Sequence, residues 1–158
     1  MWVDQAQQLL SQYWREVIKI SIRGVPFHWR RYKERYRLLG TRCESCDNIF
    51  FPMREICPSC RRDGKPVPIT FSGAGKVFTY TVIRVAPEGF KAYTPYLIGV
   101  IQLNEGPKVT SQIVDCPLDA VYIGMPVEVC FRKIREQGQH GIICYGFKFR
   151  PAHNLEAE

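Results

Sequence analysis

The sequence contains no long hydrophobic run, and no stretch approaches the roughly 18 apolar residues that a transmembrane helix needs. Residues 1–20 carry polar and charged groups throughout and lack the apolar centre of a signal peptide. Hydrophobic residues make up 46% of the 158-residue chain and charged residues 23%, as in an ordinary globular protein. We therefore expect a protein without a membrane span or secretion signal, built from one ordinary domain or two small ones plus an arm.

Recognisable catalytic motifs are also missing. The three histidines, His28, His140 and His153, are scattered, and none has a serine, cysteine or carboxylate at a recognisable spacing. The segment Ser72-Gly73-Ala74-Gly75-Lys76 lacks the spacing and the trailing Ser/Thr of a phosphate-binding loop. It leads into an expected strand, so we interpret it as a bulge in a barrel, with Lys76 free to approach an anionic ligand. The sequence predicts a protein that is not an enzyme.

Two Cys-x-x-Cys pairs, Cys43/Cys46 and Cys57/Cys60, are separated by ten residues. Two tight turns of this kind supply four soft ligands that converge on one tetrahedral metal, which predicts a zinc ribbon. The apolar segment 47–53 between them is typical of a short hairpin. Zinc is the favoured metal, rubredoxin-like iron is an alternative, and two disulfides would require a secreted protein. Because four cysteines close the coordination shell, we expect the metal to be structural.

The residues that follow the two pairs are Asp47 and Arg61, where ribbons often place glycine. The other three cysteines, Cys116, Cys130 and Cys144, stand singly in apolar, strand-like stretches and are predicted to be inert and buried. Single cysteines beside two metal-binding pairs are natural in a reducing compartment, so we expect a cytoplasmic protein.

The first 39 residues predict a helical arm. A helix capped by Asp4 would carry an apolar face, and Gly24-Val25-Pro26 would end it. A second helix fits residues 27–38, with an aromatic stripe and many arginines, and Gly40 would end it. The arm is either a hairpin packed on its own domain with a solvated basic face, or a docking surface for a partner or a phosphate-bearing ligand. The apolar face of the first helix consists of Leu9, Leu10, Tyr13, Trp14, Val17 and Ile18.

After residue 66 the pattern becomes period-two, β-branched and aromatic, which predicts strands. A first strand long enough to bend between two sheets favours a small five-stranded OB-type barrel, although other five-stranded barrels fit the pattern too. The predicted fold is therefore mainly β with N-terminal helices: a helical arm (1–39), a rubredoxin-like zinc ribbon (40–66), an OB-fold domain (67–151) and a tail (152–158). The expected strands are 68–72 continuing through 75–86, 96–104, 108–115, 126–135 and 142–150.

The loop between the first two barrel strands is rich in aromatic residues. In an OB fold this loop flanks the binding face, so Phe90, Tyr93 and Tyr96 could line an apolar groove or stack on a base. The alternative is that Tyr96 belongs to the core and the other two rings only pack the loop.

Several motifs in order resemble one family. They are residues 35–43, the two cysteine pairs with Phe51-Pro52 between them, Gly73-x-Gly75-Lys76 with its following strand, Pro95-Tyr96, residues 103–107, 123–129 and 145–151. This series closely resembles the zinc-ribbon/OB-fold family catalogued as domain of unknown function 35, particularly its archaeal members. The likeness covers roughly residues 25–151.

The resemblance implies a non-catalytic companion of thiolase-like enzymes, such as acetyl-CoA acetyltransferase or hydroxymethylglutaryl-CoA synthase. The OB domain would help to hold acyl-CoA, and the reactive cysteine would belong to the partner enzyme. By the same resemblance, Cys43, Cys46, Cys57 and Cys60 are metal ligands. Residues matching the family's first barrel strand and the following loop are the candidate ligand-binding set: Gly73, Gly75, Lys76, Tyr80, Thr81, Phe90, Pro95 and Tyr96.

The formal net charge of +7 raises nucleic-acid binding as an alternative. Residues 1–65 hold 13 Lys/Arg against 7 Asp/Glu, a balance of +6, whereas residues 66–158 hold 9 against 8, a balance of +1. Because OB faces that track a nucleic-acid strand combine stacked aromatics with a basic groove, the nearly neutral barrel half favours the acyl-CoA accessory protein. Electron transfer through an iron-filled ribbon is a third hypothesis.

Overall fold

The structure is a computed structural model that describes residues 36–87, 90–136 and 142–152, with Pro26, Trp29, Arg30 and Tyr32 ahead of them. The chain divides into two compact units, Met1–Tyr32 and Lys33–Glu158. The helix expected to begin at Asp4 lies outside the described residues. Of the second expected helix, the described residues up to Tyr36 are helical, but Leu39 and Gly40 already belong to a strand.

The helical elements with defined bounds in the described ranges are two 3-10 turns, η1 (Lys91–Tyr93) and η2 (Leu118–Ala120). The helical residues between Pro26 and Tyr36 are isolated and define no helix with bounds in the described ranges, so the predicted N-terminal helical arm is not supported. Within them, no helix is both long enough and apolar enough to cross a membrane.

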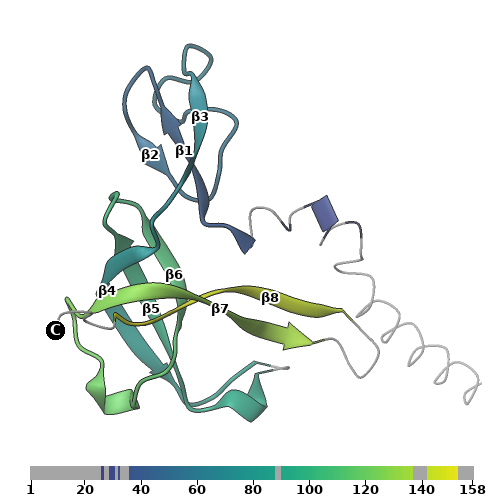
Figure 1. The fold of residues 1–158 in the computed structure, drawn as a ribbon, viewed down its shortest axis with the longest axis vertical. Helices are drawn as coiled ribbons and strands as arrows, with labels where there is room; N and C mark the ends of the chain where they lie inside the picture. The colour runs from purple at the N-terminus through teal and green to yellow at the C-terminus, as the bar shows by residue number, and fades with distance from the viewer. Residues whose placement is uncertain are drawn as a thin grey trace, which may run out of the picture. The chain divides into compact units, whose positions relative to one another are not determined.

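A small three-stranded sheet carries the cysteine pairs. It consists of β1 (Leu39–Cys43), β2 (Ile49–Phe50) and β3 (Pro66–Thr70), in the order β2-β1-β3 with antiparallel pairing (Figure 1). Segment 47–53 was expected to form a hairpin by itself, which is wrong. Only Ile49 and Phe50 are extended, and they pair with Arg42 and Thr41, so the hairpin is made by β1 and β2 around the first cysteine pair.

Five strands form a closed barrel: β4 (Ala74–Ile83), β5 (Tyr96–Leu103), β6 (Lys108–Ile113), β7 (Pro126–Glu136) and β8 (Ile143–Pro151). Their order is β4-β5-β6-β8-β7, and β7 closes the barrel by pairing with β4 (Figure 1). The pairs are antiparallel except for β6 with β8, which is parallel. This closed five-stranded arrangement confirms the predicted OB-like barrel.

The first predicted barrel strand was wrong in extent. Residues 66–70 pair with β1 in the small sheet, and only β4 enters the barrel. Gly73 separates the two strands with a φ of 82°, a left-handed conformation that favours glycine. The expected bulge at 73–75 was also misplaced, because the register shift lies between Val77 and Thr79.

The core of the barrel follows the period-two pattern of its strands. On β5, Leu97, Ile101 and Leu103 point inward and are buried, and they meet Val77 and Phe149 from other strands. Alternate positions on β5, such as Tyr96 and Ile98, lie on the outer face and are only half-buried. The barrel thus has a filled interior and an outer face available for a ligand.

Aromatic residues join the small sheet to the barrel. Phe51, which lies between the two cysteine pairs, packs edge-on against Phe71 and Phe147, with ring centroids 5.9 and 5.8 Å away. Leu38 and Phe71 belong to the same buried cluster as the barrel core. The cysteine-bearing sheet and the barrel therefore share a hydrophobic core.

Candidate metal centre and barrel pocket

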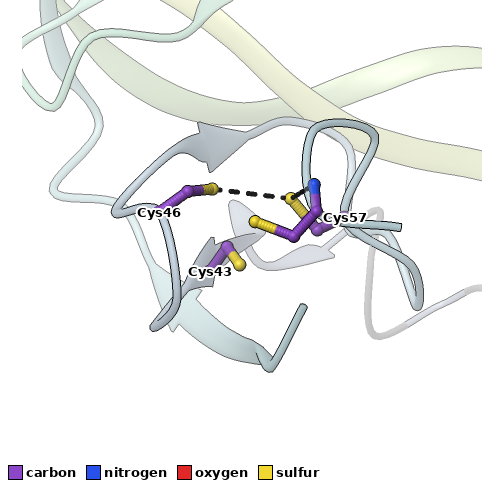
Figure 2. Close-up of side chains that lie close together, drawn as sticks. Cys43, Cys46 and Cys57 are labelled. Carbon is purple, nitrogen blue, oxygen red and sulfur yellow. Dashed lines mark hydrogen bonds between the residues drawn. The ribbon is translucent and has the colours of Figure 1, made fainter. Parts of the chain in front are cut away.

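The structure brings Cys43, Cys46, Cys57 and Cys60 together, with all four sulfur atoms within 4.8 Å of one another. Figure 2 shows the side chains of Cys43, Cys46 and Cys57 gathered between two turns. The sulfur atoms of Cys46 and Cys57 are 3.6 Å apart. A tetrahedron with Zn–S bonds of about 2.3 Å has sulfur atoms about 3.8 Å apart, so the spacing of this pair fits a four-thiolate metal site.

Both cysteine pairs lie in turns of the same form. The Asp47 N–H donates to the Cys43 carbonyl and the Arg61 N–H to the Cys57 carbonyl, each at 2.8 Å. Asp47 has a φ of 61° and Arg61 a φ of 53°. Both residues therefore occupy the left-handed conformation for which ribbons often use glycine. The turns keep the geometry of the site, but each non-glycine residue in this conformation costs backbone free energy.

Interactions among the clustered thiols give Cys43 and Cys60 very different pKa values. Burial raises the pKa of Cys43, but donation from the backbone N–H groups of Cys46 and Ser45 and from neighbouring thiols outweighs it and brings the pKa to about 6. Interaction with the thiol of Cys46, together with burial, raises the pKa of Cys60 to about 12. The first thiolate thus forms easily and the last is opposed by its neighbours, which is the repulsion that a bound divalent cation relieves.

Burial and ligand type both favour a closed site. Cys43 and Cys57 are 0% and 1% exposed. Among the residues that the structure describes, the metal-binding group contains these four cysteines and no histidine or carboxylate. A four-cysteine shell leaves no open position for substrate, so the arrangement suits a structural metal.

A second candidate site is a pocket of about 370 Å³ on the barrel. It lies between the β4–β5 loop and strands β5, β6, β7 and β8, on the face where OB folds bind their ligands. Two residues of the predicted ligand set, Phe90 and Tyr96, line it, and their ring centroids are 6.2 Å apart. The other lining residues are Pro87, Ile98, Thr110, Ser111, Gln112, Ile134, Phe147 and Lys148.

The other predicted ligand residues do not line this pocket. Gly73 and Gly75 are close-packing positions: an added Cβ would clash with Val129 at Gly73 and would meet the Gln102 carbonyl oxygen at 2.5 Å at Gly75. The remaining four are exposed: Lys76, Tyr80, Thr81 and Pro95.

Sequence reasoning missed Lys148 as a pocket residue. It is 8% exposed, although lysine is almost never buried without a partner. Burial in the barrel wall lowers the pKa of its ammonium. The clue in the sequence was a charged residue between Phe147 and Phe149, but only the fold shows that both faces of β8 are covered here.

The single cysteines differ in their surroundings. Cys130 and Cys144 are buried on β7 and β8 as expected, whereas Cys116 lies in a bend after β6 and is only partly buried. Burial raises the pKa of Cys116 and Cys130. A raised pKa disfavours the thiolate that a reactive cysteine needs.

These features define a class of protein in which a four-cysteine ribbon is joined to a five-stranded OB barrel. Residues 30–66 match the family described as "ChsH2, rubredoxin-like zinc ribbon domain" and residues 69–132 match "ChsH2, C-terminal OB-fold domain". A DUF35 domain-containing scaffold protein of Methanocaldococcus jannaschii is 53% identical over 126 residues, which cover 80% of this chain and 89% of that protein. The chain belongs to the DUF35 family.

Two more distant relatives are named as parts of enzymes that contain other chains. The benzoylsuccinyl-CoA thiolase subunit BbsA of Thauera aromatica is 29% identical over 113 residues, which cover 72% of this chain and 75% of that one. The solved structure "Ltp2-ChsH2(DUF35) aldolase" contains a similar chain with a TM-score of 0.59 and 27% identity, covering 80% of this chain and 92% of that one.

Proposed function

We propose that this protein is a non-catalytic scaffold subunit of a thiolase-like enzyme that condenses acyl-CoA thioesters. The proposal places an acyl thioester in the barrel pocket and a structural zinc ion in the ribbon. The observation that carries it is the largely apolar pocket on the ligand face of an OB barrel, in a chain whose relatives are named scaffold proteins and a thiolase subunit.

The size of the pocket supports a slender ligand. Its volume of about 370 Å³ is at the lower end of small-molecule sites, which span about 300–1,000 Å³. Such a site suits the acyl and pantetheine end of a coenzyme A thioester and leaves the nucleotide end outside. Phe90 and Tyr96 would form apolar walls beside the chain, while Gly73 and Gly75 would act through backbone packing.

In the ribbon, Cys43, Cys46, Cys57 and Cys60 would hold zinc. When bound, the metal supplies folding free energy, on the order of 10 kcal/mol at neutral pH for zinc-finger peptides. Phe51 lies between the two cysteine pairs, so this contribution would help to keep it in place against Phe147 of the barrel. Iron would satisfy the same ligands, and metal analysis distinguishes the two.

A non-catalytic role is consistent with the thiols of the barrel. Condensation of acyl groups on a thiolase-like enzyme uses a reactive cysteine, and the raised pKa values of Cys116 and Cys130 make them unsuitable for that role. In this proposal the nucleophile comes from the partner enzyme.

Affinity purification of the tagged full-length chain from its native extract, followed by mass spectrometry, tests the scaffold role. We expect a thiolase or synthase to be recovered in stoichiometric amount at physiological salt. Recovery of nucleic acid that is lost at high salt, without a condensing enzyme, would instead support the nucleic-acid alternative and overturn this proposal. Turnover of an acyl-CoA by the isolated chain would overturn its non-catalytic part.

A further inference from the structure

Lys148 has a largely buried side chain, and its ammonium has no anionic partner among the described residues. It is 8% exposed and lines the barrel pocket. Within the described part of the chain, its ammonium has neither a hydrogen bond nor an ion pair, and Nζ lies 5.9 Å from the centroid of the Tyr93 ring. Covering a charge without a compensating group is costly, so a ligand that fills this pocket should bring an opposite charge to the ammonium.

The charged groups that act on the Lys148 ammonium do not neutralise it. Its pKa is lowered mainly by burial; Cys130 and Asp115 raise it, and Arg132 lowers it. Those two residues are paired with each other, with Arg132 Nη2 and Asp115 Oδ2 3.0 Å apart. The pocket therefore keeps a positive charge of its own.

The walls around this charge define the kind of ligand. Phe90, Ile98 and Ile134 are apolar and contribute to the pocket surface. Ser111 already donates its hydroxyl to the Phe147 carbonyl at 3.3 Å, so Thr110 and Gln112 are the polar side chains left for a ligand. One ammonium with few other donors suits a carboxylate on an aliphatic chain, whereas a phosphate dianion calls for several donors and charges.

We propose that Lys148 selects acyl groups that end in a carboxylate, by pairing with that carboxylate inside the apolar pocket. This inference rests on the proposed function, since it names the class of acyl group that the barrel pocket would receive. It adds a specificity-determining residue to a pocket otherwise defined by shape. An uncharged acyl group of equal size would leave the ammonium buried and unpaired, so the pocket should discriminate against it.

The test compares two stable thioether ligands of matched shape on the full-length, zinc-loaded protein by isothermal titration calorimetry. S-(2-carboxyethyl)-CoA carries the carboxylate, and S-(3-methylbutyl)-CoA replaces it with an isosteric branched alkyl end. We expect the wild type to bind the carboxylate ligand at least tenfold more tightly. Lys148→Met should abolish this preference while retaining affinity for the alkyl ligand, and Lys108→Met, which removes an exposed charge outside the pocket, should leave it unchanged.

Each outcome separates the inference from the proposed function. Equal wild-type affinity for both ligands would overturn the role of Lys148 without needing any variant to fold, and would leave acyl-CoA binding intact. If neither ligand binds, alone or with the partner enzyme present, the proposed acyl-CoA site itself fails.

The corresponding pantetheine thioethers, which lack the nucleotide phosphates, identify the anion that Lys148 binds. A preference that persists in them supports the carboxylate, and an equal loss of affinity for both CoA ligands in Lys148→Met shows that the lysine binds phosphate instead.

Discussion

Arg61→Gly should tighten metal binding by the ribbon. Arg61 directly follows the second cysteine pair and has a φ of 53°, which costs a non-glycine residue about 1–2 kcal/mol. Glycine avoids this cost but loses about 0.5–1 kcal/mol in chain entropy on folding, so the net gain should be about 0.5–1 kcal/mol. Because ribbon folding and metal binding are coupled, this gain should appear as a roughly two- to fivefold tighter zinc affinity.

The assay is competition between the protein and a chromophoric zinc chelator at constant pH. Arg61→Ala is the matched control, because it removes the same exposed charge without relieving the backbone conformation, and it should bind zinc as the wild type does. Asp47→Gly should gain less than Arg61→Gly, because it also removes the exposed ion pair between Asp47 and Arg42. Zinc affinity of Arg61→Gly equal to or weaker than that of Arg61→Ala would refute the reasoning.

Three further predictions concern the metal site, the core and one carboxylate. Cys57→Ser should lower the zinc content below one per chain and unfold the ribbon, whereas Cys116→Ser should keep full zinc content; elemental analysis distinguishes them. Phe149→Ala should destabilise the barrel by about 3–5 kcal/mol in urea unfolding, because Phe149 is fully buried in the core. Burial raises the pKa of Glu105, but donation from the Ser72 N–H outweighs it and leaves the pKa lowered. The ionised Glu105 therefore stabilises the fold above its unfolded pKa, and this contribution is lost as the pH falls through its folded pKa. Glu105→Gln should cost less than about 1 kcal/mol at pH 7 and nothing in acid; an equal cost at both pH values would contradict this.

The cysteine cluster and the barrel strands were predictable because each depends on local pattern. Two close Cys-x-x-Cys pairs converge through short turns, and β5 to β8 follow period-two stretches bounded by turn residues, so their predicted limits agree to within about two residues. The first barrel strand was overextended because residues 66–72 have strand character in either sheet, and pairing with β1 decides which sheet they join.

The pocket was only partly predictable because it is assembled from four separate segments. Phe90 and Tyr96 lie together in the loop that the OB fold identified in advance. Lys148 enters through β8, more than 50 residues later in the chain, and its burial depends on the neighbouring β6 strand and the β4–β5 loop. The exposed residues of β4 were included in the predicted ligand-binding set because sequence likeness identifies a strand. It does not identify which face of that strand a ligand contacts.

The packing of Phe51 gives the ribbon a structural relation to ligand binding. Phe51 lies between the two cysteine pairs and contacts Phe147, which is itself a wall of the barrel pocket. An edge-on aromatic pair of this kind contributes about 0.5–1.5 kcal/mol beyond burial alone. Since the position of Phe51 depends on the folded ribbon, a metal held by the four cysteines would stabilise the wall beside which Lys148 lies. A structural metal would thereby support acyl-group selection without contacting the ligand.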